Sequence, residues 1–234
     1  MQLNIESISR LVPILLKRLD IWNEREVALG CLCKVGLHPH ADTRMIIEGL
    51  LLHLSTVDYS DITSKKYLLD IIFEISLPKI VAIREIAVLR DAIFKTCLSL
   101  QSGAEIPLKI ISIRILALYQ HLLLPVFLSQ HLQSDERLVR REAVTICIQQ
   151  ICTFKGSHSE WYSLSSNLMN DDDSVTRILS SRLVWHIISS EGFAVVNSGD
   201  FFVRLCDAVN DGSIEVRENV IYANLGMLAD GDAS

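Results

Sequence analysis

Apolar residues recur at helical spacing along most of the chain, and short polar segments interrupt them at fairly even intervals. The clearest copies of the pattern run from Asp135 to Val144 and from Asp211 to Val220. Each passes from an acidic turn through an arginine into an apolar helix. Apolar residues spaced three and four apart indicate amphipathic helices. Because the unit recurs six times at a period near forty residues, the sequence predicts a helical-repeat solenoid.

The pattern predicts an all-α fold of about six antiparallel helix pairs wound as a right-handed solenoid. The expected pairs are 3–18 with 21–36, 41–57 with 61–77, 79–101 with 105–121, 123–133 with 136–154, 159–169 with 173–190, and 199–209 with 214–229. Gly36 is expected to end its helix in a left-handed cap, which glycine adopts most easily. Since no low-complexity linker divides the chain, we predict a single domain over residues 1–234.

A basic position recurs near the start of each second helix, and it aligns the six copies. Its members are Arg25, Lys65, Lys109, Arg140, Thr176 and Arg217, with Arg177 as the alternative in the fifth copy. Three residues later, on the same helix face, lie Ala28, Leu68, Ser112, Ala143, Leu179 and Val220. An acidic residue precedes each copy, where a carboxylate can cap a helix: Asp20, Asp61, Glu105, Asp135, Asp171 and Asp211.

Two interpretations of this basic ladder stay open. The arginines can bond to acids or carbonyls of adjacent repeats, or they can form a continuous anion-binding groove. The neighbouring acids Glu26, Glu142 and Glu218, the net charge of −6 and an aromatic content of 6% weaken the groove interpretation.

Several segments resemble HEAT repeats. Leu11-Val12-Pro13-Ile14-Leu15-Leu16 is similar to the first helix with its kinking proline, and Leu124-Pro125-Val126-Phe127-Leu128 repeats it. Val139-Arg140 with Ala143, and Val216-Arg217, resemble the second-helix signature. The second and third copies depart from it, because lysines replace arginine and the third first-helix is long. HEAT versus armadillo packing in residues 41–121 therefore stays open.

The segment 135–229 also resembles the C-terminal repeats of the ATM-activator HEAT family, through Trp185 and Val216-Arg217. HEAT proteins include phosphatase scaffold subunits, nuclear import receptors and chromosome-organising subunits, so the resemblance implies a scaffold. The first helix is apolar for a terminal cap, with Leu3, Ile5 and Ile8. We therefore expect the chain to belong to a larger array.

The resemblance further implies that the second helices line a concave, partner-facing surface. The positions expected there are Arg141, Thr145, Gln149, Arg177, Ser181, Trp185, Glu218, Tyr222 and Gly226. Trp, Tyr and Arg are the residue types that most often anchor protein interfaces. Trp185 has an alternative role, since it can pack between repeats instead.

Two clusters of metal-ligand residue types have simpler explanations. Cys31 and Cys33 precede His38 and His40, but two residues on a helix diverge by about 200°. CxxC and HxxxH spacings are absent, so we expect no metal. The run Asp171-Asp172-Asp173 lacks the glycine and distal glutamate of a calcium loop and is interpreted as a helix cap.

The sequence carries no recognisable catalytic or glycine-rich nucleotide motif. His186 is interpreted as a hydrogen-bonded helix residue, and no cofactor is expected. The six cysteines lie mostly in apolar helical runs, which is typical of reducing compartments. Neither a signal peptide nor a membrane span is expected, so an intracellular location, cytoplasmic or nuclear, is predicted.

Together these features favour a non-enzymatic scaffold that binds another protein along the concave second-helix face. The alternative is a nucleic-acid-contacting repeat protein with a basic groove. Salt dependence separates the two, because phosphate contacts make affinity fall steeply with salt.

Overall fold

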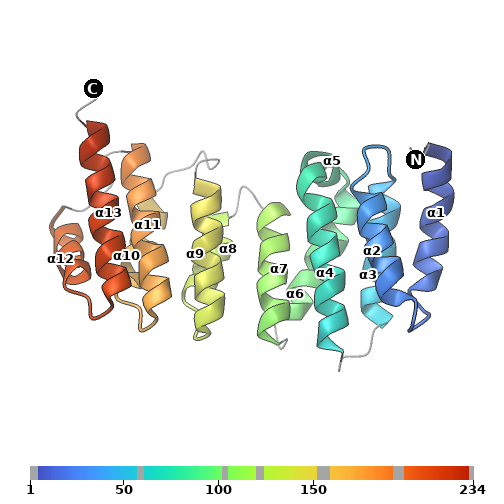
Figure 1. The fold of residues 1–234 in the computed structure, drawn as a ribbon, viewed down its shortest axis with the longest axis horizontal. Coiled ribbons are helices and arrows are strands. Elements are labelled where there is room, and N and C mark those ends of the chain that lie inside the picture. Colours follow the sequence, from blue (N-terminus) through green and yellow to red (C-terminus); the bar gives the residue numbers. More distant parts are fainter. Residues whose placement is uncertain are drawn as a thin grey trace. The chain divides into compact units, whose positions relative to one another are not determined.

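A computed structural model of the chain describes residues 5–56, 61–101, 105–119, 124–151, 159–191 and 198–231. Helices occupy almost all of these segments, and no β-strand occurs within them (Figure 1). The predicted all-α class is confirmed. The described residues form two compact units, Met1–Gln120 and His121–Ser234, and each is described by itself. That the whole chain is one domain stays a prediction.

Unit 1 (Met1–Gln120) is built from two rows of helices. Its elements are α1 (Ile5–Arg18), α2 (Arg25–Gly36), α3 (Thr43–Thr56), α4 (Ile62–Ser76), η1 (Leu77–Lys79), α5 (Ile80–Glu85), α6 (Ala87–Gln101) and α7 (Ile106–Tyr119). Sequential partners α1 and α2, α3 and α4, and α6 and α7 pack together. The second helices α2, α4 and α7 also pack in order, as do the first helices α1, α3 and α6.

The first helix of the third repeat is broken, although the sequence predicts one helix over 79–101. A short 3₁₀ segment contains Pro78, α5 ends at Glu85, and α6 begins at Ala87. Ile86 has φ −88° and ψ 88°, which lies outside the helical region and interrupts the ladder of backbone hydrogen bonds. The third repeat therefore has a short helix before its packed pair.

Unit 2 (His121–Ser234) has the same two-row construction. Its helices are α8 (Leu124–Leu132), α9 (Arg137–Ile151), α10 (Ser159–Leu168), α11 (Ser174–Glu191), α12 (Ser198–Val209) and α13 (Ile214–Gly231). The pairs α8 with α9, α10 with α11 and α12 with α13 pack together, and the second helices α9, α11 and α13 pack in order. These bounds follow the predicted pairs closely, because helical periodicity is regular throughout this half of the sequence.

Close helix approaches in unit 1 depend on two glycines. Gly36 is the last residue of α2, and a Cβ built on it would lie 2.5 Å from Cδ1 of Ile75 on α4. The following residue, Leu37, has φ −74°, so the expected left-handed cap is wrong. Gly49 on α3 plays the same part toward α1, since its Cβ would lie 2.6 Å from Cδ2 of Leu16. These glycines are needed for packing rather than for chain reversal.

Each unit buries its apolar side chains between its two rows. In unit 1 the fully buried side chains include Leu32, Leu50 and Ile72, and in unit 2 they include Val144 and Leu183. Burial of such side chains supplies most of the favourable free energy of folding. Among the described helices, none combines the length and the apolar character needed to span a membrane.

Candidate protein-binding surface

In unit 2, Arg140 joins one repeat to the next. Its Nε and Nη2 donate to the two carboxylate oxygens of Asp171 at 2.7 and 2.8 Å. Its Nη1 donates to the carbonyls of Ser134 and Asp135 at 2.9 and 3.0 Å. A planar guanidinium matches a carboxylate with two parallel bonds, so this contact fixes orientation as well as attraction. Arg140 thereby ties α9 to the turn before α11.

Arg177 repeats this arrangement one repeat later. Its Nε and Nη2 bind Asp211 at 2.7 and 2.8 Å, and its Nη1 binds the carbonyl of Asp171 at 2.8 Å. The ladder position of the fifth repeat is therefore Arg177, one residue after Thr176. The small position three residues later shifts with it, from the half-buried Leu179 to the buried Ser180.

With this alignment, three residues that the sequence predicted on the surface of α11 are not available there. Arg177 is occupied in the ladder, Ser181 is buried, and Trp185 is only 8% exposed. The burial of Trp185 agrees with its alternative role in packing. Counted from Arg177, the positions equivalent to Arg141, Thr145 and Gln149 are Ile178, Arg182 and His186, in that order.

The sequence pattern did not single out Arg182 as a surface residue, and it indicated His186 only as a hydrogen-bonded helix residue. Both side chains are exposed. Arg182 donates from Nε to Oδ1 of Asn219 on α13 at 3.0 Å. Exposed polar side chains on adjacent second helices therefore lie next to one another. The spacing from Arg177 to Asp211, rather than helix amphipathicity, carries the signal that would have found them.

The remaining predicted positions lie on α9 and α13. Arg141 pairs with Asp173, with Nε 2.7 Å from Oδ2, and Thr145 donates to the carbonyl of Arg141 at 2.9 Å. Gln149 and Glu218 are exposed. Tyr222, the one aromatic residue in the sequence of α13, is 72% exposed.

Gly226 falls in the part of α13 whose side chains lie outside the described residues. We call the described set the second-helix surface of unit 2. It comprises Arg141, Thr145, Gln149, Ile178, Arg182, His186, Glu218 and Tyr222.

Electrostatics show that the ladder charges are balanced. The hydrogen bond from Arg141 lowers the pKa of Asp173, and the bond from Arg177 lowers the pKa of Asp211. Burial alone would raise the pKa of Asp171, but hydrogen bonds from Arg140 and from the Asp173 backbone lower it overall. Each carboxylate is thus held ionised against a guanidinium. Little of the positive charge on these arginines is left for an external anion.

The ladder is looser in unit 1. Arg25 donates from Nε to the carbonyl of Leu19 at 3.0 Å, while its Nη1 lies 3.9 Å from Oδ2 of Asp61. Its guanidinium also lies 5.0 Å from the ring of Trp22. Lys65 is buried and Lys109 is half-buried at the next two ladder positions.

A groove of about 440 Å³ lies between α2 and α4 on the second-helix side of unit 1. The side chains lining it are Arg25, Glu26, Leu29, Thr63, Ser64, Lys66, Tyr67 and Asp70. Lys66 and Asp70 form an ion pair at 2.6 Å. A Cβ built on nearby Gly30 would meet no atom within 4 Å, so α2 leaves open space there. The groove carries both signs of charge beside an exposed tyrosine.

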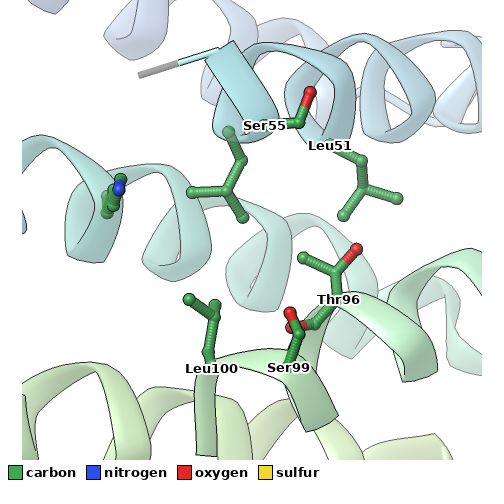
Figure 2. A pocket seen from close by; sticks show the side chains of 7 residues that line it. Leu51, Ser55, Thr96, Ser99 and Leu100 are labelled. Atoms are coloured by element: carbon green, nitrogen blue, oxygen red, sulfur yellow. The ribbon is translucent and has the colours of Figure 1, made fainter. Parts of the chain in front are cut away.

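A second cavity, of about 200 Å³, lies among α3, α4 and α6. Figure 2 shows Leu51, Ser55, Thr96, Ser99 and Leu100 around it. Thr96 and Ser99 donate to carbonyls of their own helix at 2.9 and 2.8 Å. Because these hydroxyl protons are already used, the cavity presents few donors to a ligand.

The cysteine–histidine segment has a different arrangement from a metal site. Cys33 donates from Sγ to Glu74 at 3.1 Å, and burial raises the pKa of its thiol to about 11. The rings of His38 and His40 stand 5.7 Å apart. Across the described segments, no group of three or more His, Cys, Asp or Glu side chains is placed to hold a metal ion.

The other cysteines differ in exposure. Cys97 and Cys147 are buried, Cys31 is half-buried and Cys206 is exposed, while Cys152 lies outside the described residues. The acidic run is a cap, since Asp173 accepts from the backbone N–H of Thr176 at 2.9 Å and from its hydroxyl at 2.8 Å. Asp171 also accepts a hydrogen bond from Arg140.

Comparison with known proteins gives information on the fold alone. No family model matches the chain, and no curated protein matches it. Among solved structures, the chain is similar to the crystal structure of an engineered protein from the Northeast Structural Genomics Consortium. The two share 16% sequence identity with a TM-score of 0.53, over 91% of this chain and 94% of that chain. At this identity the likeness concerns backbone architecture and carries no activity or partner.

Proposed function

We propose that the chain is a non-enzymatic scaffold of HEAT- and armadillo-like repeats, which binds another protein along its second helices. The observation that carries the proposal is the exposed anchor set on α11 and α13. Tyr222 is 72% exposed, and Arg182 lies beside Asn219 on the neighbouring helix. Tyrosine and arginine supply large contact areas and directed hydrogen bonds, which is why they are frequent among interface hot spots.

The packing order of the helices supports a solenoid. Second helices follow one another as α2, α4 and α7 in unit 1 and as α9, α11 and α13 in unit 2. In a solenoid each repeat contacts its neighbours, so rows of this kind are expected. The short α5 before α6 and α7 favours an armadillo-like third repeat, since armadillo repeats can have three helices.

Charge pairing favours a protein partner over nucleic acid. Arg140, Arg141 and Arg177 are each bound to an aspartate in the turn before the next second helix. A phosphate-binding groove needs basic side chains that displace counterions. The groove of unit 1 also contains Glu26 and Asp70 among its lining residues. These acids would repel a phosphate backbone, whereas a peptide of mixed charge would fit them.

The proposal is tested by affinity capture followed by measurement of partner affinity with surface variants. Arg182→Ala and Tyr222→Ala should each weaken binding by roughly 1–3 kcal/mol, because both remove exposed anchors without opening the core. Val203→Ala on α12 is the matched control, since Val203 is also exposed but lies on a first helix. Binding should change little with salt.

Trp185→Ala distinguishes an anchor from a core residue. We expect it to lower the free energy of unfolding by about 3–5 kcal/mol, as for other buried large aromatic side chains. If Arg182→Ala and Tyr222→Ala leave the affinity of a captured partner unchanged, the second-helix surface is the wrong one. Tight heparin or DNA binding with a steep salt slope would instead support the nucleic-acid alternative.

A further inference from the structure

Arg217 on α13 begins the same contact as the two arginines before it. The Nη1 atoms of Arg140 and Arg177 each donate to the carbonyl six residues earlier, and Arg217 does so to Asp211. In the two earlier copies Nε and Nη2 then bind an aspartate 31 or 34 residues further along the chain. Within the described part of the chain, Arg217 forms no ion pair with a carboxylate. The guanidinium of Arg217 is therefore placed like those of Arg140 and Arg177, but no carboxylate among the described residues accepts from its Nε and Nη2.

Burial at an equivalent position of the three second helices makes the same point independently. The residue four positions after the ladder arginine lies on the same helix face. At this position Val144 on α9 is 0% exposed and Ser181 on α11 is 2% exposed. Ile221 on α13 is 45% exposed. The helices α9 and α11 are each followed in the row by another second helix, which packs against them.

We propose that the outer face of α13 docks a further helical repeat, one that carries an aspartate in the turn before its second helix. The aspartate would take both free donors of Arg217, and the apolar face of that second helix would cover Ile221. An aspartate is favoured because Arg140 and Arg177 each bind one, through two parallel hydrogen bonds that match the geometry of the guanidinium. Among the described helices of unit 2, α13 is the last second helix in the row. The inference does not depend on what the second-helix surface binds.

An extended chain supplies a defined probe. A second copy of residues 192–231 is appended after Gly231, so that the new segment follows α13 as the original segment follows α11. Both α11 and α13 have 18 residues, which preserves the spacing. The copied Asp211 then stands toward Arg217 as Asp211 stands toward Arg177. Native-state hydrogen exchange of α13 amides reports docking locally.

Docking should raise the exchange protection of α13 amides in the extended chain roughly tenfold or more, the scale of a charge-assisted hydrogen bond. Arg217→Gln should remove most of that gain in the extended chain and change the natural chain far less. The control replaces the copied aspartate with asparagine, and Arg217→Gln should then have equal effects in both chains. Ile221→Glu should be tolerated in the natural chain and should prevent docking in the extended one.

The proposal is overturned if α13 protection is the same in the natural and extended chains. It is overturned equally if Arg217→Gln costs the same protection in both, because the fork would then receive no carboxylate.

Discussion

The two units differ in the polar contacts that join their helices. In unit 2 the arginines of α9 and α11 reach aspartates near the N-terminal ends of the following second helices. In unit 1, Nζ of Lys79 donates to the carbonyls of Gly36 and His38 at 2.8 and 2.7 Å. These carbonyls lie at the C-terminal end of α2. Within the third repeat, Arg84 of α5 binds the carbonyl of Leu118, near the C-terminal end of α7.

Packed helix pairs can therefore be aligned by two kinds of polar contact. Guanidinium–carboxylate pairs need both partners ionised, so they weaken when the acid is protonated. Cations at a helix C-terminus bind backbone carbonyls that do not titrate, and they also complement the helix dipole. Unit 2 is therefore expected to respond more strongly to acid, and unit 1 to loss of its capping cations.

The largest effect should come from a feature that both units share. Ala143 and Ala28 occupy the same buried position beside the neighbouring helix. Ala143→Arg and Ala28→Arg should each lower the free energy of unfolding by about 3–5 kcal/mol, since each buries an unpaired charge and overpacks the contact. Thermal melting measures this, with the exposed Gln149→Arg as control. An unchanged melting temperature for either variant would show that the ladder alignment is wrong.

Removal of the capping cation tests the contacts at the helix ends of unit 1. Lys79→Met keeps the apolar stem but leaves two carbonyls and the Thr43 hydroxyl without their common donor. We expect a loss of about 1–3 kcal/mol, the cost of unmade hydrogen bonds at part-buried groups. Urea unfolding measures it, and Lys95→Met on the exposed side of α6 is the control. Equal midpoints for the two variants would show that the cap contributes nothing.

Acid should destabilise both units, and unit 2 more than unit 1. The lowered pKa values of Asp171, Asp173 and Asp211 mean that the unfolded state takes up protons first, so unit 2 loses stability as pH falls below about 4. In unit 1, Asp61 has a lowered pKa, chiefly through its hydrogen bonds with Ser64.

Protonation of two buried histidines should lower stability at a higher pH than protonation of the aspartates does. Burial lowers the pKa of His53 in unit 1 and of His131 in unit 2, so both are held neutral in the fold. Unfolding then gains protons below about pH 6.5, and stability declines from that pH downward. Urea unfolding followed by NMR signals of each unit at pH 7, 5 and 3 tests the order. A larger loss in unit 1 than in unit 2 between pH 5 and pH 3 would contradict the account.

Helix positions were predictable because each pair presents a regular apolar face and a polar turn. The break at Ile86 was not, since Ile83-Arg84-Glu85-Ile86-Ala87 contains neither glycine nor proline and continues the helical pattern. The close contact of Gly36 with Ile75 was also hidden, because it depends on which residue of α4 faces α2.

Exposure was predictable for Gln149 on α9 and for Glu218 and Tyr222 on α13, but not for the positions on α11. Thr176 and Arg177 both suit the start of a helix, and local pattern cannot choose between them. The choice is made by Asp211, which lies 34 residues beyond Arg177 and accepts hydrogen bonds from its Nε and Nη2. Moving the alignment by one residue turns the α11 surface by about 100°. Arg182 and His186 therefore replace Ser181 and Trp185 as exposed positions.

Paired arginines and aspartates join the repeats of unit 2 closely, whereas in unit 1 the corresponding pair, Arg25 and Asp61, is loose. A double-mutant cycle on Arg177→Gln and Asp211→Asn, read from urea unfolding, measures that coupling directly. The account predicts about 1.5–3 kcal/mol for this pair. It predicts less than about 0.5 kcal/mol for the cycle on Arg25→Gln and Asp61→Asn, whose charged atoms lie 3.9 Å apart. Equal coupling energies in the two units would contradict it.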